Sequence, residues 1–106
     1  RGDFTRGIMA NVYTPYAGTL DEARQLYANY YATHPFTHLS DSPIDLKQVV
    51  NTNKCLLHLE KQGEMLLISS IIDNLTKGAS GQAVQNMNLL FGLPEDSGLR
   101  LKAPAF

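Results

Sequence analysis

Residues 79–91 carry apolar side chains at the spacing of an amphipathic helix. One stripe, with a period of 3.6 residues, is formed by Ala79, Ala83, Val84, Met87, Leu90 and Phe91. The opposite face carries only amides, namely Gln82, Gln85, Asn86 and Asn88. No Asp, Glu, Lys or Arg occurs from residue 78 to residue 93. Because a solvated helix face normally carries charges, this pattern predicts that the amide face is covered as well, by another domain or by a polar ligand.

Three stretches have the pattern of strands. The side chains alternate over residues 7–13, which indicates a strand with one buried and one partly covered face. Residues 55–60 and 64–72 indicate two more strands, joined by a short turn in which Gly63 supplies the positive φ. The last of these strands hardly alternates, so it is predicted to be central and covered on both sides. The chain offers too little cover for both sides, which predicts a further domain or a second subunit over one of them.

A second helix is predicted between the first two strands. Thr19 and Glu22 have the spacing of a capping box, apolar side chains recur at helical spacing from Leu20, and Pro35 ends the helix. Residues 40–53 are polar and rich in turn formers, which predicts a loop with a short extended piece at 47–50. The elements together predict an α+β fold, a two-layer sandwich of order β-α-β-β-α with the helices packed on a mostly antiparallel sheet.

Small residues precede the C-terminal helix, namely Gly78, Ala79, Ser80 and Gly81. They predict a loop that leaves the N–H groups of the first helical turn open to an anionic or polar ligand. Lys77 beside them fits a nearby negative group, because the helix dipole disfavours a cation there. Small residues before a helix also serve close packing, so the pattern leaves both interpretations open.

Composition narrows the function classes. A chain of 106 residues forms one domain at most, and its net charge of −1 gives no electrostatic case for a nucleic-acid or anionic-membrane partner. No apolar run reaches the roughly 20 residues of a membrane-spanning helix. The single cysteine, Cys55, cannot form an internal disulfide, so a reducing, cytoplasmic location is expected.

Side chains that could carry chemistry are few. His34 and His38 have a spacing that can hold a metal on a helix, but Pro35 lies between them and no third ligand is near, so no metal site is predicted. Cys55 heads a predicted strand without a base beside it, which favours a structural thiol over a nucleophile. No catalytic residue is therefore assigned within the chain.

The segment DNLTKGASGQAVQNMNLLFGLPE, which starts at Asp73, closely resembles the C-terminal signature of the N-acetyl-gamma-glutamyl-phosphate reductase family. The Arg-Gly pair at Arg6 and the Thr-Asn-x-Cys segment that starts at Thr52 resemble two further family segments, so the resemblance covers essentially the whole chain. It implies the C-terminal part of a glyceraldehyde-3-phosphate-dehydrogenase-like fold. Neither a G-x-G-x-x-G fingerprint nor the family's Pro-Gly-Cys motif is present. We therefore expect residues 1–106 to be the C-terminal substrate and dimerisation segment, with the dinucleotide-binding domain upstream.

The resemblance also implies a reaction and a set of site residues. The intact enzyme would use NADP to convert N-acetyl-gamma-glutamyl phosphate to the semialdehyde in arginine biosynthesis, as a homo-oligomer, and this segment would be inactive alone. Gln82 matches the amide that meets the nicotinamide carboxamide, Ser80 and Gly81 would line the same pocket, and Asn86 would hold the helix to the nucleotide domain. Arg6 is a candidate anchor for the substrate's carboxylate or phosphate, or else serves the start of its strand.

A second hypothesis is a freestanding small-ligand-binding or oligomerisation module without catalysis. The two hypotheses differ at the amide face of the last helix. Contact with another domain or with NADP supports the reductase, whereas a solvated face in a stable monomer supports the module.

Overall fold

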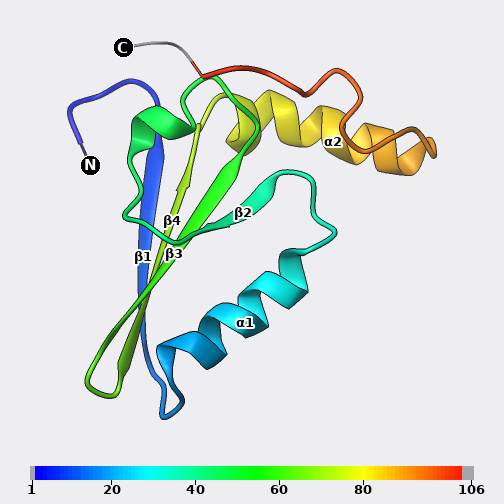
Figure 1. Ribbon diagram of the computed structural model, residues 1–106. Coiled ribbons are helices and arrows are strands. Elements are labelled where there is room, and N and C mark those ends of the chain that lie inside the picture. The colour runs from blue at the N-terminus through cyan, green and yellow to red at the C-terminus, as the bar shows by residue number, and fades with distance from the viewer. Residues whose placement is uncertain (1, 104–106) are drawn as a thin grey trace.

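A four-stranded sheet forms the centre of the fold in the computed structural model, which describes residues 2–103 (Figure 1). The elements are β1 (Ile8–Pro15), α1 (Leu20–Tyr31), β2 (Thr37–Ser40), β3 (Cys55–Gln62), β4 (Met65–Ile72) and α2 (Gly81–Leu90). The strand order is β1-β4-β3-β2, with β4 antiparallel to both of its neighbours and β2 parallel to β3. The predicted α+β class and the mostly antiparallel sheet are confirmed.

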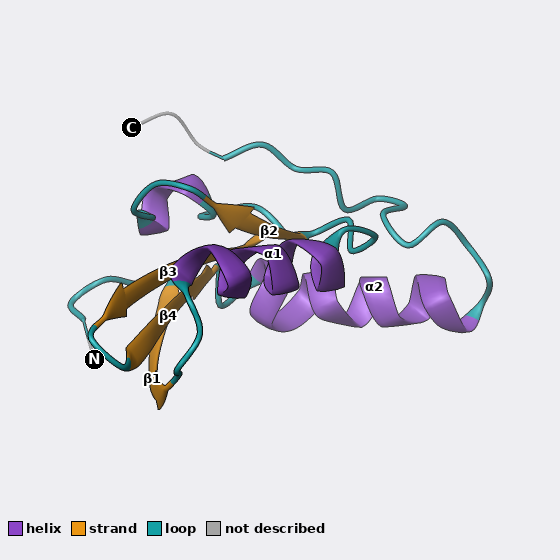
Figure 2. Ribbon diagram, turned by 60° about the horizontal axis from the view of Figure 1, so that its bottom comes forward, coloured by secondary structure: helices purple, strands orange, loops and turns teal. Residues whose placement is uncertain are grey.

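The local signals of the hairpin and of the first helix are confirmed as well. Gly63 joins β3 to β4 with φ at 57°. Thr19 caps α1, since its Oγ1 accepts from the Glu22 N–H at 3.1 Å and Glu22 Oε2 accepts from the Thr19 N–H at 2.9 Å. Helix α1 lies across one face of the sheet (Figure 2), and its Ala23 is buried against Leu59 and Leu66.

The segment after α1 differs from the prediction. Thr37–Ser40 forms the strand β2, whose register with β3 starts at the pair Thr37 and Cys55. Four residues are too few to show a period, and a parallel partner is not visible in local sequence. The predicted extended piece at 47–50 is wrong, because Leu46–Gln48 forms a turn of 3₁₀ helix. Asp45 caps that turn by accepting the Lys47 N–H at 2.8 Å.

Strand β1 lies at an edge of the sheet and is exposed along most of its length. Ile8 and Val12 on one side of the strand and Met9 and Tyr13 on the other are large apolar side chains in contact with solvent. The sequence predicts a shortage of cover for the sheet, and the structure locates that shortage at β1. Cover by another domain or a second subunit stays a prediction.

Helix α2 is oriented against the expectation from its pattern. It projects beyond the end of the sheet and lies beside the C-terminal segment (Figure 1), so only α1 forms the second layer of the predicted sandwich. Gly81, Gln85 and Asn88 are its buried residues, whereas Leu90 and Phe91 are 83% and 75% exposed. Among residues 2–103, the amides of α2 form hydrogen bonds, whereas its apolar stripe does not pack on the sheet.

Candidate functional site

The helix that carries the predicted cofactor residues begins earlier than the sequence indicates. Thr76–Ser80 forms one π-helical turn that continues into α2, and Ser80 already has helical angles of −63° and −37°. The N–H groups of Gly78 and Ser80 donate to carbonyl oxygens at 2.9 and 3.3 Å. The prediction of a loop with open N–H donors is therefore wrong, because the preceding turn supplies their acceptors.

Gly81 serves close packing. A Cβ atom added at Gly81 would lie 1.7 Å from Oδ1 of Asn53 and 2.7 Å from the carbonyl oxygen of Thr76. Asn53 is itself buried and donates through Nδ2 to the Leu99 carbonyl at 3.0 Å. Of the two interpretations of the small residues, the structure supports the packing one at Gly81.

The four amides of α2 divide into an inner and an outer pair. Asn88 is buried and donates through Nδ2 to the carbonyl oxygens of Glu95 and Ser97, both at 3.0 Å. Gln82 and Asn86 are exposed, and their side chains share a hydrogen bond of 3.3 Å. The sequence predicted cover by another domain or a polar ligand, but the inner pair is covered by the chain's own C-terminal segment. The outer pair has no such cover among the described residues, so its cover by another domain or a ligand stays a prediction.

Gln85, the other inner amide, connects two charged groups. It accepts from Lys77 Nζ at 2.5 Å and donates to Glu95 Oε1 at 2.7 Å. Burial lowers the pKa of Lys77, while the nearby Cys55 and Glu95 act in the opposite direction. Lys77 is therefore explained by contacts within the chain and gives no separate evidence for an anionic ligand.

Arg6 lies beside a buried carboxylate. Its Nε is 3.0 Å from Oδ2 of Asp73, whose side chain is 0% exposed, while 33% of the Arg6 side chain is exposed. The Nε–H is not aimed well enough to form a regular hydrogen bond, so the contact is mainly electrostatic. Within residues 2–103 the two terminal nitrogens of Arg6 have no protein acceptor, which leaves them able to bind an anion.

Asp73 also receives three backbone N–H groups. Its Oδ2 accepts from Asn51 at 2.6 Å, and its Oδ1 accepts from Leu75 and Thr76 at 2.7 and 3.1 Å. Burial alone would raise the pKa of Asp73, but these donors and Arg6 outweigh it and hold the pKa below the ordinary value. Asp73 is thus an ionised carboxylate at neutral pH.

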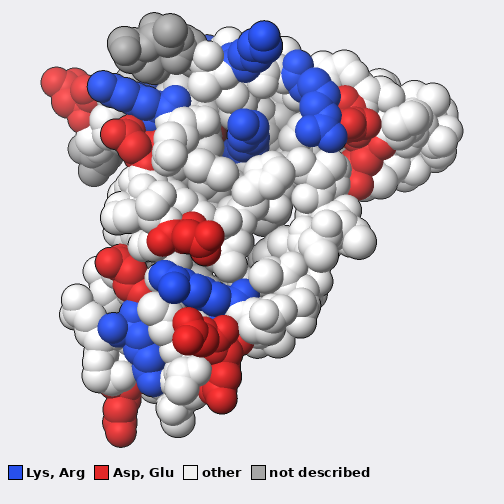
Figure 3. Space-filling view, viewed as in Figure 1, with Lys and Arg blue, Asp and Glu red and all other residues white. Residues whose placement is uncertain are grey.

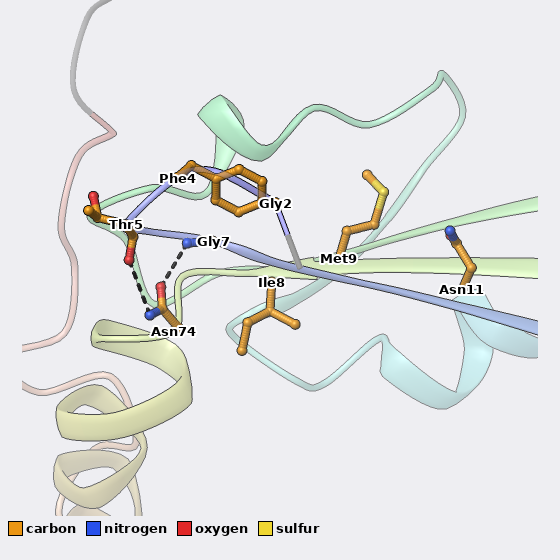
Figure 4. A pocket seen from close by; sticks show the side chains of 8 residues that line it. All are labelled: Gly2, Phe4, Thr5, Gly7, Ile8, Met9, Asn11 and Asn74. Atoms are coloured by element: carbon orange, nitrogen blue, oxygen red, sulfur yellow. Dashed lines mark hydrogen bonds between the residues drawn. The ribbon is translucent and has the colours of Figure 1, made fainter.

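A cavity of about 540 Å³ lies around the start of β1, next in sequence to this ion pair. Its lining consists of Gly2, Phe4, Thr5, Gly7, Ile8, Met9, Asn11 and Asn74 (Figure 4). Asn74 closes one end by accepting from the Gly7 N–H at 2.7 Å and donating to the Thr5 carbonyl at 3.4 Å. Its volume is in the range of small-molecule sites.

The sequence assigned no role to Asn74, because only the fold brings it 67 positions back to Gly7. Its place directly after a buried strand and within the signature segment was the available signal. The structure thus gathers Arg6, Asp73 and Asn74 at one end of the sheet. No contact among the described residues joins Gln82 or Asn86 to that group.

The remaining chemical candidates stay separate. Cys55 Sγ is 3.5 Å from Ser70 Oγ, and no base contacts it among the described residues. His34 stacks on Tyr30, with the ring centres 5.7 Å apart. Residues 2–103 contain no group of three His, Cys, Asp or Glu side chains that could hold a metal ion, and none of their helices has the length and hydropathy of a membrane span. Basic and acidic side chains are interspersed on the face shown in Figure 3.

Comparison with known proteins gives a consistent result. The profile of the family described as semialdehyde dehydrogenase, dimerisation domain, matches residues 1–74. Proteins named N-acetyl-gamma-glutamyl-phosphate reductase are 61% identical in Christiangramia forsetii, 61% in Bacteroides fragilis and 54% in Flavobacterium johnsoniae, each over all 106 residues. The chain spans 33% of the length of these relatives and aligns with their C-terminal third.

Proposed function

The chain belongs to the semialdehyde dehydrogenase dimerisation-domain family, and from its similarity to named reductases we propose that it is the C-terminal part of an NADP-dependent N-acetyl-gamma-glutamyl-phosphate reductase. The intact enzyme reduces N-acetyl-gamma-glutamyl phosphate to the semialdehyde in arginine biosynthesis, in the cytoplasm. The observation that carries this proposal is the identity of 54–62% to reductases of that name over the whole chain. A dinucleotide-binding domain upstream of this segment completes the enzyme.

We propose that the residues of this chain take part in catalysis without supplying the nucleophile. The chain's only thiol, Cys55, is partly buried at the head of β3, with Ser70 as its neighbour. A nucleophilic thiol needs a base beside it, and no base contacts Cys55 among the described residues. The acyl phosphate is therefore attacked by a group outside this segment, and the chain alone is inactive.

The outer amides of α2 fit a cofactor contact. Bound NADPH supplies the hydride, and an amide side chain can both donate to and accept from its carboxamide, which fixes the rotation of the ring. Gln82 and Asn86 are exposed and are bonded only to each other within the described residues, so both remain available to a ligand or a domain. We assign Gln82 to the nicotinamide carboxamide and Asn86 to the nucleotide domain, with Ser80 and Gly81 beside them.

Arg6 fits the substrate side of the same site. Its terminal nitrogens form the planar fork that binds carboxylates and phosphates in a bidentate manner, and Asp73 already neutralises part of its charge. The cavity at the start of β1 is lined by Thr5 and Gly7 but not by Arg6 itself, so the assignment rests on the partly exposed guanidinium and its ion pair with Asp73. We assign Arg6 to the substrate's carboxylate or phosphate.

Exposed apolar residues indicate that this segment also contacts other protein in the assembled enzyme. Large apolar side chains remain exposed on β1 and at the C-terminal end of α2, where Leu90 and the capping residue Phe91 lie. Surfaces of this kind on an otherwise regular domain mark contacts with other protein. We propose that the dinucleotide-binding domain and a second subunit cover them, in keeping with the dimerisation named in the family description.

The test is the kinetics of the intact protein with Gln82→Ala. Loss of a hydrogen-bonded amide, about 1–2 kcal/mol, predicts a rise of the KM for NADPH by about 5- to 30-fold. Gln25→Ala is the matched control, because Gln25 is also a helix-surface amide bonded to an amide one turn on. A variant with unchanged kinetics removes Gln82 from the site.

The wild-type protein decides the larger question. NADPH-dependent reduction of N-acetyl-gamma-glutamyl phosphate by the intact protein is the expected result. An intact protein that lacks this activity and still forms oligomers would instead be an oligomerisation module without catalysis, the function that the family description by itself supports.

A further inference from the structure

Asp73 connects three segments that are far apart in sequence. It contacts Arg6 just before β1, the N–H of Asn51 in the loop before β3, and the N–H groups of Leu75 and Thr76 at the start of the C-terminal helix. A carboxylate that is fully withdrawn from solvent needs such partners to remain ionised. Its contacts therefore fix each of the three segments relative to the same two oxygen atoms.

Among residues 2–103, the contact with Asp73 is the side-chain cap at the start of the C-terminal helix. Leu75, at the position before the π-helical turn, makes no capping bond, and neither does Ser80 before α2. The first N–H groups of the continuous helix thus find a side-chain acceptor in Asp73 Oδ1. Loss of this acceptor would free the helix start, and Gln82 lies about two turns further along the same helix.

The contact with Arg6 selects which part of the guanidinium stays available. A guanidinium presents one edge through Nε and another through its two terminal nitrogens. Asp73 lies on the Nε edge at 3.0 Å, so the terminal pair is left for an external anion. The carboxylate also holds an otherwise flexible side chain in one place, which lowers the entropy lost when an anion binds.

We propose that Asp73 is a positioning residue that holds Arg6 for the anionic group of the substrate and, through its second oxygen, holds the helix that carries Gln82. The inference rests on the proposed function, since it takes the anion to be the carboxylate or phosphate of the acyl-phosphate substrate. Asp73 itself touches neither ligand. A single buried carboxylate thereby couples the substrate contact to the cofactor contact.

The test compares Asp73→Asn with Arg6→Ala and with the double variant in the intact reductase. Asp73→Asn keeps the shape of the side chain and removes its charge. We expect the KM for the acyl phosphate to rise about 10-fold or more while kcat changes less than about threefold. The reason is that Arg6, without its contact to Asp73, is more mobile and binds the substrate less well. The KM of the double variant for the acyl phosphate should be no higher than that of Arg6→Ala alone, because Asp73 acts on the substrate through Arg6.

Asp45→Asn is the matched control, since Asp45 also accepts a backbone N–H at a helix start. It should leave both kinetic constants unchanged. A purely structural Asp73 predicts a different pattern, in which the effects of Asp73→Asn and Arg6→Ala on the KM multiply in the double variant. That pattern, or a normal KM in a folded Asp73→Asn protein, overturns the proposal.

A second measurement serves if Asp73→Asn does not fold. Added guanidinium ion should lower the substrate KM of Arg6→Ala towards the wild-type value in a saturable manner, because Asp73 still offers its carboxylate to the vacated position. The absence of any rescue in a folded Arg6→Ala protein overturns the proposal. Failure of the proposed function is a separate result, since it appears as a wild-type protein without NADPH-dependent reductase activity.

Discussion

Replacement of Gly81 by alanine tests whether the helix start is fitted to the loop before β3. In most helices this substitution is favourable, because alanine has a helix propensity about 1 kcal/mol better than glycine. Gly81 has ordinary helical angles, so backbone strain gives no reason against it. The obstacle is the neighbour, since the new Cβ would lie 1.7 Å from Oδ1 of Asn53.

The magnitude follows from what Asn53 would lose by moving. Asn53 is buried and its Nδ2 is bonded to the Leu99 carbonyl at 3.0 Å, so displacement leaves a buried amide unpaired at a cost of about 1–3 kcal/mol. The second close approach, 2.7 Å to the Thr76 carbonyl, adds overpacking of about 1–3 kcal/mol. After the gain of about 1 kcal/mol in helix propensity, we expect a net destabilisation of about 1–5 kcal/mol.

Urea unfolding of the 106-residue chain, followed by circular dichroism, measures this change in the free energy of unfolding. Gly78→Ala is the matched control, because its Cβ would lie no closer than 3.3 Å to any atom, the nearest being the flexible Cδ1 of Ile72. It should be neutral or slightly stabilising. In an Asn53→Ala background, Gly81→Ala should cost at least about 1 kcal/mol less, because the clashing oxygen is gone.

A Gly81→Ala chain as stable as the wild type would refute the close-packing explanation of this glycine. Equal costs in the presence and absence of the Asn53 side chain would refute the assignment of the clash to that residue. In the second case the Thr76 carbonyl would be the remaining cause.

Three further predictions concern other contacts. Asn88→Ala removes the bonds to the Glu95 and Ser97 carbonyls, so it should destabilise the chain by about 1–3 kcal/mol and speed amide hydrogen exchange from residue 95 onward, as mass spectrometry would show. Leu90→Gln changes a side chain that is 83% exposed, so it should alter the free energy of unfolding by less than about 0.5 kcal/mol. If this surface is an assembly contact, the same substitution should disrupt assembly of the intact protein in sedimentation experiments. The pKa of Asp73 is lower in the folded than in the unfolded chain, so its ionised form stabilises the fold. This contribution to the free energy of unfolding is fully present above the ordinary pKa of about 3.9 and is lost as the pH falls through the pKa of the folded chain. Asp73→Asn should therefore reduce the loss of stability at acid pH in unfolding measurements.

Local chemistry made the elements predictable. The capping box of Thr19 and Glu22 closes within four residues, and Gly63 meets the demand of a two-strand turn by its own backbone. The alternation of β1 and the apolar run of β4 reflect the side-chain period of a strand. Such patterns can be interpreted without knowing which distant residues are in contact. The same is true of the family resemblance at Arg6 and Asp73.

The site was less predictable. The helical pattern grouped Gln82 and Asn86 with Gln85 as amides on an uncharged face, and the family resemblance then selected Gln82 and Asn86 for the cofactor site. The structure separates them, since Gln85 is satisfied by Lys77 and Glu95 whereas the other two face outward. A periodic pattern shows that a face differs from its opposite, but it does not show which segment lies against it.

By itself, the sequence determined the α+β class, the positions of three strands and two helices, and a resemblance to a reductase family. Only the tertiary structure decided the pairing of β2, the burial of amides in place of apolar side chains on α2, and the meeting of Arg6, Asn51 and the helix start at Asp73. The physical reason is range. Turns, caps and periods are set by neighbours along the chain, whereas a buried polar group is placed by the partners that satisfy it, and here those partners lie as many as 67 residues away.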